Sequence, residues 1–232
     1  MGSLRRLRRS ELPADAAQLA RFLLGKVLVH DSRWGRMSGR IVETEAYGVG
    51  DAAAHSFRGR TERNHSMFLR PGHAYVYFVY GTWFAMNVSA EPEGVGGGVL
   101  LRALEPLQGI ERMRTRRTGA TDPRLASGPG CLAAALGIDR SLDGANLCAS
   151  GTLWLANPRP CGGPVEVGTS VRIGITKDAH KPLRFFVRGS PSVSGPRWMQ
   201  DPTLGLDPRP ARSRGSAPPP SLPLTQGKNR GS

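Results

Sequence analysis

The stretch from Gly39 to Asn87 constrains the fold most, because it contains two runs of residues that suit β-strands. We expect one strand over Ser38–Tyr47 and a second over Ala74–Tyr80, both rich in β-branched and aromatic side chains. Side chains alternate along a strand, so Glu43 and Glu45 fall on the same face. A face with two carboxylates either meets solvent or forms the wall of a site, and the alternation leaves both open.

Patterns along the rest of the chain predict further helices and strands. Apolar residues at helical spacing predict a helix within Pro13–Leu24, and shorter helices are expected over Ile110–Arg117 and Cys131–Leu136. The remaining predicted strands are Val27–Val29, Thr82–Ser89, Val99–Leu104, Leu153–Leu155, Val171–Ile175 and Leu183–Val187.

The 232 residues favour a single domain, which we place at 12–195 between two flanking segments. Residues 1–11 form a basic arm that is either a loose terminus or a contact for phosphates. Residues 196–232 hold eight of the 19 prolines and show no periodicity, so we expect a disordered Pro/Arg-rich tail.

The charge of the chain favours a polyanion as partner. Lys and Arg number 32 against 18 Asp and Glu, which gives a net charge of +14 and a pI near 11.0. Such an excess binds nucleic acid through counterion release, although a solvated basic surface without a partner is the simpler alternative. No long apolar run or basic amphipathic anchor suggests a membrane.

The three cysteines are spaced too widely for a disulfide framework or a thiolate zinc site. The basic start of the chain is not followed by an apolar signal-peptide region. We therefore expect a reducing compartment: the cytoplasm, in association with the nucleoid in a bacterium, or the nucleus in a eukaryote.

Arginines accompany the two strands of the central stretch. Arg58, Arg60 and Arg63 lie in the polar loop between them, which is either solvated or a contact for phosphates. Arg102 stands inside the apolar run Val99–Leu104. An arginine in such a run requires a buried acid, so we expect it to pair with the glutamate strand.

Several motifs together resemble the alkyladenine (3-methyladenine) DNA glycosylase family, in collinear order from about residue 12 to residue 194. They are Gly39–Tyr47, Ala54-His55-Ser56, Arg63-Asn64, Tyr75-Val76-Tyr77, Tyr80-Gly81, Leu100–Pro106, Ser127-Gly128-Pro129 and Lys181–Ser190. The resemblance implies an α+β fold, a single mixed domain with a curved antiparallel β-sheet core and flanking helices. It also implies removal of alkylated purines from double-stranded DNA, without a metal or other cofactor. We expect a monomer.

The resemblance also implies roles for individual residues. Glu45 matches the general base that activates water, and Arg102 the arginine that holds this water and the carboxylate. The residues that match the base pocket are Tyr47 and His55, which stack on the base, Tyr77, which closes the pocket, and Asn87, which crowds the amino group of guanine. Expected contacts to DNA are the wedge Tyr80, the loop arginines Arg58, Arg60 and Arg63, and Arg188 and Ser190 near the end of the match.

Two other functions remain as alternatives. A non-catalytic module could bind damaged DNA with the same pocket, although the Glu45–Arg102 pair argues against it. A glycosidase of free sugars or nucleosides could use Glu43 and Glu45, but two carboxylates on one strand face do not easily flank a substrate. The stretch 39–87 contains no lysine, which favours hydrolysis over a Schiff-base mechanism. The range of lesions is left open.

Overall fold

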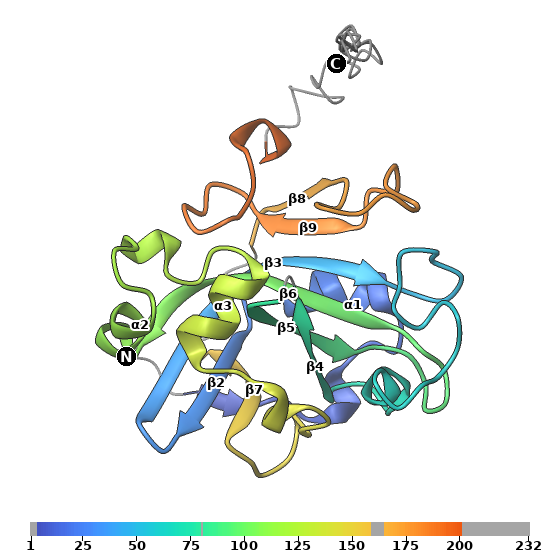
Figure 1. Ribbon diagram of the computed structural model, residues 1–232, viewed down its shortest axis with the longest axis horizontal. Helices are drawn as coiled ribbons and strands as arrows, with labels where there is room; N and C mark the ends of the chain where they lie inside the picture. The colour runs from blue at the N-terminus through green and yellow to red at the C-terminus, as the bar shows by residue number, and fades with distance from the viewer. Residues whose placement is uncertain (1–3, 80, 159–164, 201–232) are drawn as a thin grey trace, which may run out of the picture.

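The long strand β3 (Gly35–Tyr47) lies at the centre of the fold, and all its neighbours are antiparallel to it (Figure 1). This computed structural model describes residues 4–79, 81–158 and 165–200. The strand β6 (Gly98–Gln108) pairs along one edge of β3. On the other edge, β2 (Val27–Ser32) covers the first half and β9 (Arg184–Val187) covers Glu43 to Glu45. The end of β3 is therefore buried on both edges.

The described residues form one nine-stranded sheet that curves around the core. Its order is β1-β7-β2-β3-β6-β5-β4, and β8 joins through β9. The strands not yet given are β1 (Leu4–Arg6), β4 (Ala74–Val79), β5 (Trp83–Ser89), β7 (Leu153–Pro158) and β8 (Val167–Ser170). The curved antiparallel sheet and the mixed α+β class confirm the predicted fold.

The pairing of β3 with β6 shifts register on both sides of Glu43. Such a bulge bends a strand and changes the direction of nearby side chains. It lies at the first carboxylate of the predicted face, where the sequence alone shows only regular alternation.

Three α-helices accompany the sheet: α1 (Ala16–Leu23), α2 (Ile110–Arg116) and α3 (Pro129–Leu136). Helix α1 packs on β3 and β6, and its four buried residues recur at the predicted helical spacing. It begins after Asp15, whose side chain accepts the Gln18 N–H at 2.8 Å as an N-cap. Helix α3 packs on β5 and β6. Single turns of 3₁₀-helix are η1 (Arg9–Glu11), η2 (His65–Phe68), η3 (Asp122–Arg124), η4 (Arg140–Leu142) and η5 (Arg197–Gln200).

One predicted strand, Val171–Ile175, is wrong. The strand is β8, which ends at Ser170, and residues 171–175 form a loop. The polar groups of this loop bind side chains and carbonyls of other segments instead of a neighbouring strand. The Arg172 guanidinium pairs with Asp51, and the Ile173 N–H donates to Glu45 at 2.8 Å.

Both flanking segments extend the folded body further than expected. In the N-terminal arm, β1 pairs with β7, and Arg5 forms an ion pair with Glu11 at 2.6 Å, so this part is not a loose terminus. At the other end, residues 196–200 still contact the body, where the Met199 carbonyl accepts an N–H of Arg184 at 3.2 Å. The rest of the expected tail lies outside the described residues. Within the described ranges, no helix has the length and apolar character needed to cross a membrane.

Candidate active site

A cavity of about 280 Å³ opens beside the end of β3. Its polar and aromatic walls are Tyr47, His55, Tyr77, Asn87 and Arg102, and its apolar walls are Ala53, Met67, Val79, Ala85, Leu100, Pro129 and residues 173–175. The structure thus brings together the four residues predicted to bind the base and the predicted arginine. The volume is slightly below the usual range for drug-sized ligands, which suits one small ring system.

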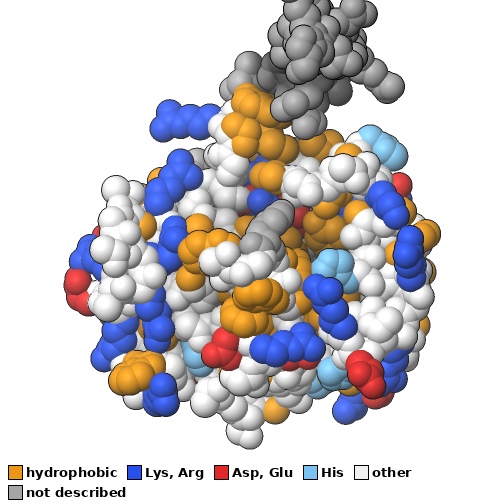
Figure 2. Space-filling view, in the orientation of Figure 1, with side chains coloured by type: hydrophobic (Ala, Val, Ile, Leu, Met, Phe, Trp, Pro, Cys, Tyr) orange, Lys and Arg blue, Asp and Glu red, His pale blue; other side chains and the backbone are white. Residues whose placement is uncertain are grey.

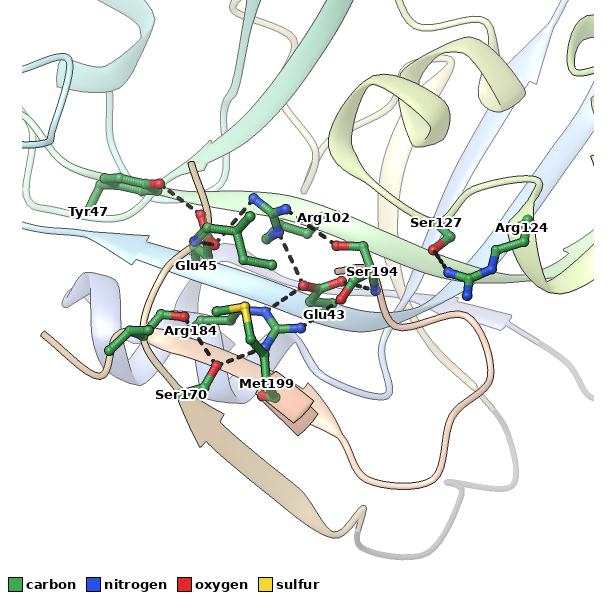
Figure 3. A network of polar contacts seen from close by, with 12 residues as sticks. Glu43, Glu45, Tyr47, Arg102, Arg124, Ser127, Ser170, Arg184, Ser194 and Met199 are labelled. Atoms are coloured by element: carbon green, nitrogen blue, oxygen red, sulfur yellow. Dashed lines mark hydrogen bonds and ion pairs between the residues drawn. The ribbon is translucent and has the colours of Figure 1, made fainter. Parts of the chain in front are cut away.

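Glu45 is fully buried and lies beside Tyr47 and Arg102 of the cavity wall (Figure 3). Its Oε1 accepts the Ile173 N–H at 2.8 Å and lies 3.2 Å from Arg102 Nη1. Its Oε2 accepts the Tyr47 hydroxyl at 2.8 Å. All three donors belong to residues of the cavity wall. The carboxylate is therefore separated from the cavity only by the groups that hold it.

Arg102 lies between the two glutamates, as the apolar run around it predicts. Its Nε donates to Glu43 Oε1 at 3.1 Å, while Nη1 reaches Glu45 and Nη2 donates to Ser194 Oγ at 3.3 Å. Burial by itself lowers the pKa of Arg102, but the charges of Glu45 and Glu43 outweigh burial and the pKa is raised. The guanidinium is thus a fixed positive charge in the wall of the cavity.

Glu43 faces the same buried cluster but not the cavity. Its Oε1 accepts Nε of both Arg102 and Arg184, the latter at 2.7 Å, and its Oε2 accepts the Ser194 N–H at 2.7 Å. The strand pattern left open whether the face with both glutamates meets solvent or forms the wall of a site. In the structure neither carboxylate meets solvent. Arg184 and Ser194 were not among the predicted site residues, although Arg184 stands in an apolar run just as Arg102 does.

Two tyrosines support the histidine of the cavity. The His55 ring meets Tyr77 edge-on, with centroids 4.6 Å apart, and its Nδ1 lies 3.1 Å from the Tyr75 hydroxyl oxygen. Tyr75 and Tyr77 stack with centroids 5.1 Å apart. Tyr75 had no predicted role, and its hydroxyl position shows that it orients His55.

Burial sets the protonation of these rings. Burial lowers the pKa of His55, and the charge of Arg63 lowers it further. Burial raises the pKa of Tyr77 to about 12. Burial also raises the pKa of Tyr47, and the neighbouring charge of Glu45 adds to this. At neutral pH the cavity therefore contains a neutral imidazole and neutral phenols.

The predicted DNA contacts differ in their surroundings. Arg58, Arg60 and Arg63 are exposed in the loop that follows His55. Arg188 lies 3.2 Å from Glu166, and Ser190 is buried with its hydroxyl donating to Glu105 at 2.6 Å. The roles of these residues in DNA binding stay predictions, as does the wedge Tyr80, which lies outside the described residues. Figure 2 shows Lys and Arg side chains around the rim of one face, with hydrophobic side chains towards its middle.

The described ranges contain no group of three or more metal-ligating side chains close enough to hold an ion.

A curved antiparallel sheet thus places a carboxylate–arginine pair behind an aromatic cavity, in a strongly basic chain. The chain belongs to the methylpurine-DNA glycosylase (MPG) family, whose model matches residues 10–191. This confirms the resemblance seen in the sequence. It also makes the protein a DNA glycosylase, a hydrolase of N-glycosyl bonds that acts in base excision repair.

Similar proteins occur in distant organisms. Two bacterial relatives have names that include 3-methyladenine DNA glycosylase. The Mesorhizobium japonicum protein is 62% identical over 83% of this chain and 92% of its own length, and the Paraburkholderia phytofirmans protein is 53% identical over 83% and 90%. The DNA-3-methyladenine glycosylase of Mus musculus is 47% identical over 77% of this chain and 58% of its own length.

Proposed function

We propose that this protein excises alkylated purines from double-stranded DNA by hydrolysing the N-glycosidic bond with a water that Glu45 activates. The observation that supports this most is the Glu45–Arg102 pair directly behind the aromatic cavity. Only a base that has left the helix can enter such a cavity, because stacking hides its glycosidic bond in the duplex.

Glu45 is suited to take a proton from the attacking water. Its Oε1 already accepts two donors, whereas Oε2 accepts only the Tyr47 hydroxyl. Each carboxylate oxygen has two lone pairs, so Oε2 keeps one that could accept a proton from water. The transition state resembles an oxocarbenium ion, and a nearby ionised carboxylate stabilises this charge as well.

The rings of the cavity suit a purine that carries a fixed positive charge. Tyr47, Tyr77 and His55 line the cavity, and the electron-rich face of an aromatic ring attracts a cationic ring. The lowered pKa of His55 keeps the imidazole neutral, so it does not repel this cation. Asn87 lines the same cavity, where its side chain would crowd the amino group of guanine.

The charge of the protein supports binding to the duplex. Arg58, Arg60 and Arg63 would contact phosphates beside the cavity, and Tyr80 would fill the gap left by the extruded base. The net charge of +14 supplies attraction that does not depend on sequence. We propose a monomer that works where the DNA lies, at the nucleoid or in the nucleus.

The alternatives have less support. A module that only binds damage would not need a buried carboxylate–arginine pair behind its cavity. A glycosidase that uses Glu43 and Glu45 would need both carboxylates beside the substrate. Glu43 instead turns away from the cavity, where two arginines and the Ser194 N–H occupy it.

The proposal is tested with wild type, Glu45→Gln and the control Glu111→Gln, whose carboxylate is exposed on α2. Each protein is incubated with methylated duplex DNA and, separately, with a methylated free nucleoside. We expect wild type and the control to release base from the duplex only. Tight binding without release by wild type would favour the binding module, and equal release by Glu45→Gln would remove Glu45 from its role.

A further inference from the structure

Arg184 is a fully buried guanidinium that does not line the cavity. Its Nε donates to Glu43 at 2.7 Å, and Nη1 donates to Ser170 Oγ at 2.7 Å. Nη1 also reaches the Met199 carbonyl at 3.2 Å, and Nη2 reaches the Ser194 carbonyl at 2.9 Å. These partners fix the orientation of the side chain, and among the described residues its one ion-pair partner is Glu43 (Figure 3).

The buried cluster contains two carboxylates and two guanidiniums, so its charges balance. Arg102 is shared between Glu43 and Glu45, whereas Arg184 pairs with Glu43 alone. If Arg184 were absent, one guanidinium would face two buried carboxylates. Glu43 would then compete for Arg102, and its unbalanced charge would also act on Glu45. Arg184 thus leaves Arg102 available to the catalytic carboxylate.

Ser194 joins the members of this cluster through all three of its polar groups. Its N–H donates to Glu43, its hydroxyl accepts from Arg102, and its carbonyl accepts from Arg184. Ser194 and Met199 lie beyond residue 191, where the match to the family model ends. The segment 192–200 is therefore in direct contact with the charges behind the cavity.

We propose that Arg184, oriented by Ser194 and Met199, is a positioning residue that balances Glu43 and so holds Arg102 against Glu45. Arg184 acts through Arg102 and does not touch the substrate. This inference rests on the proposed function, because it assigns Arg184 a part in the work of Glu45.

The pH profile is a useful measurement because charged and titratable groups from several elements surround Glu45. They are Glu43 and Tyr47 on β3, Tyr77 on β4, Arg102 on β6, Arg172 after β8 and Arg184 on β9. Loss of Arg184 removes one of the two positive charges that hold the carboxylate pair. Without Arg184, less positive charge is left to oppose protonation of the buried carboxylates. We therefore expect the acid limb of the kcat/KM profile to move to higher pH.

The test compares Arg184→Met, Arg184→Lys and the double variant Glu43→Gln/Arg184→Met in the full chain. We expect Arg184→Met to lower kcat on methylated duplex by about 10–100-fold, as for other residues that orient a reacting group. KM should change little, because the cavity walls remain. Arg184→Lys should recover part of the loss. The double variant should exceed Arg184→Met in kcat, because no unpaired carboxylate then competes for Arg102.

Several results would overturn the inference while leaving the proposed function intact. One is wild-type kcat per folded molecule and an unmoved acid limb in Arg184→Met, with only the melting temperature lowered. Another is a double variant no more active than Arg184→Met. If Arg184→Met does not fold, Arg184→Lys is compared with wild type instead, and wild-type kcat with an unmoved acid limb in Arg184→Lys would overturn the inference. Failure of wild type to release base would count against the proposed function instead.

Ser194→Ala provides an independent test of the segment 192–200. In the full chain this change should lower kcat several-fold and leave KM unchanged. The Ser194→Ala change removes only the hydroxyl that accepts from Arg102. An unaltered kcat in Ser194→Ala would exclude this residue from the positioning of Arg102.

Discussion

The Tyr47 hydroxyl donates to Glu45 Oε2 at 2.8 Å, although the two residues lie only two positions apart on β3. The same tyrosine ring lines the cavity. One side chain thus connects the surface that meets the base with the oxygen that would accept the proton. The raised pKa of Tyr47, caused by burial and then by the charge of Glu45, keeps this hydroxyl a donor at every working pH.

Replacing Tyr47 by Phe should separate these two contributions. The ring remains, so KM should change little, whereas loss of a hydrogen bond to a charged group should lower kcat about 10-fold or more. Steady-state kinetics on methylated duplex measure both constants. In Tyr47→Ala the ring is lost as well, and KM should rise. A large rise of KM already in Tyr47→Phe would contradict this division.

Arg102→Met should lower kcat by about 10²–10³-fold, the usual cost of removing a preorganised charged donor from an active site. The matched control is Arg40→Met, which removes a β3 arginine that pairs with Glu105 away from the cavity. Single-turnover rates on methylated duplex should fall for Arg102→Met only. Equal losses in both variants would show that the effect comes from general damage to the paired strands β3 and β6.

The lowered pKa of His55 predicts a lesion-dependent effect of pH on binding. Above this pKa the ring is neutral; as the pH falls through it, below the ordinary value of 6.5, the ring gains a proton and repels a cationic purine. Binding is measured with the inactive Glu45→Gln, on duplexes that contain either cationic 7-methylguanine or neutral hypoxanthine. The affinity ratio should shift towards hypoxanthine between pH 7.5 and pH 5.

The control for this prediction is Glu45→Gln/His55→Gln, in which the ratio of the two affinities should stay constant with pH. A ratio that changes equally in both proteins would mean that another group causes the effect. Because the ratio compares two lesions in the same duplex, any general strengthening of DNA binding at low pH cancels.

The exposed loop arginines should contribute to the salt dependence of DNA binding. Arg60→Ala should reduce the slope of log K against log salt by about 1, since one phosphate contact is lost. The control is Arg33→Ala, at the exposed turn between β2 and β3. Titrations of an undamaged duplex at several salt concentrations measure both slopes. An unchanged slope for Arg60→Ala would remove this residue from the DNA surface.

Much of this fold could be predicted because local patterns and burial agree. The alternation over residues 38–47 predicts β3, and the helical spacing within Pro13–Leu24 predicts α1. An arginine inside the apolar run Val99–Leu104 correctly predicts a buried acidic partner. In each case the residues of a short segment are sufficient for the prediction. Only one local environment buries the apolar side chains of that segment and also pairs or exposes its polar ones.

The parts that could not be predicted depend on contacts between distant segments. The Ile173 N–H reaches Glu45 across 128 positions, and this contact replaces the expected strand over 171–175. The bulge at Glu43 arises from the pairing with β6, so alternation along β3 alone does not show it. Arg184 and Ser194 both bind Glu43, which lies 141 positions from Arg184 and 151 positions from Ser194.

The pairing of β9 with residues 43–45 of β3 has a consequence for biosynthesis. A ribosome completes β3 long before it reaches Arg184, so this edge of β3 stays open while most of the chain is being made. An open edge invites pairing with a second nascent chain, and inward-pointing charges are one means by which proteins prevent this. Glu43 and Glu45 place two such charges at the open edge. The same two carboxylates would thus disfavour pairing of this edge with another chain until β9 is made.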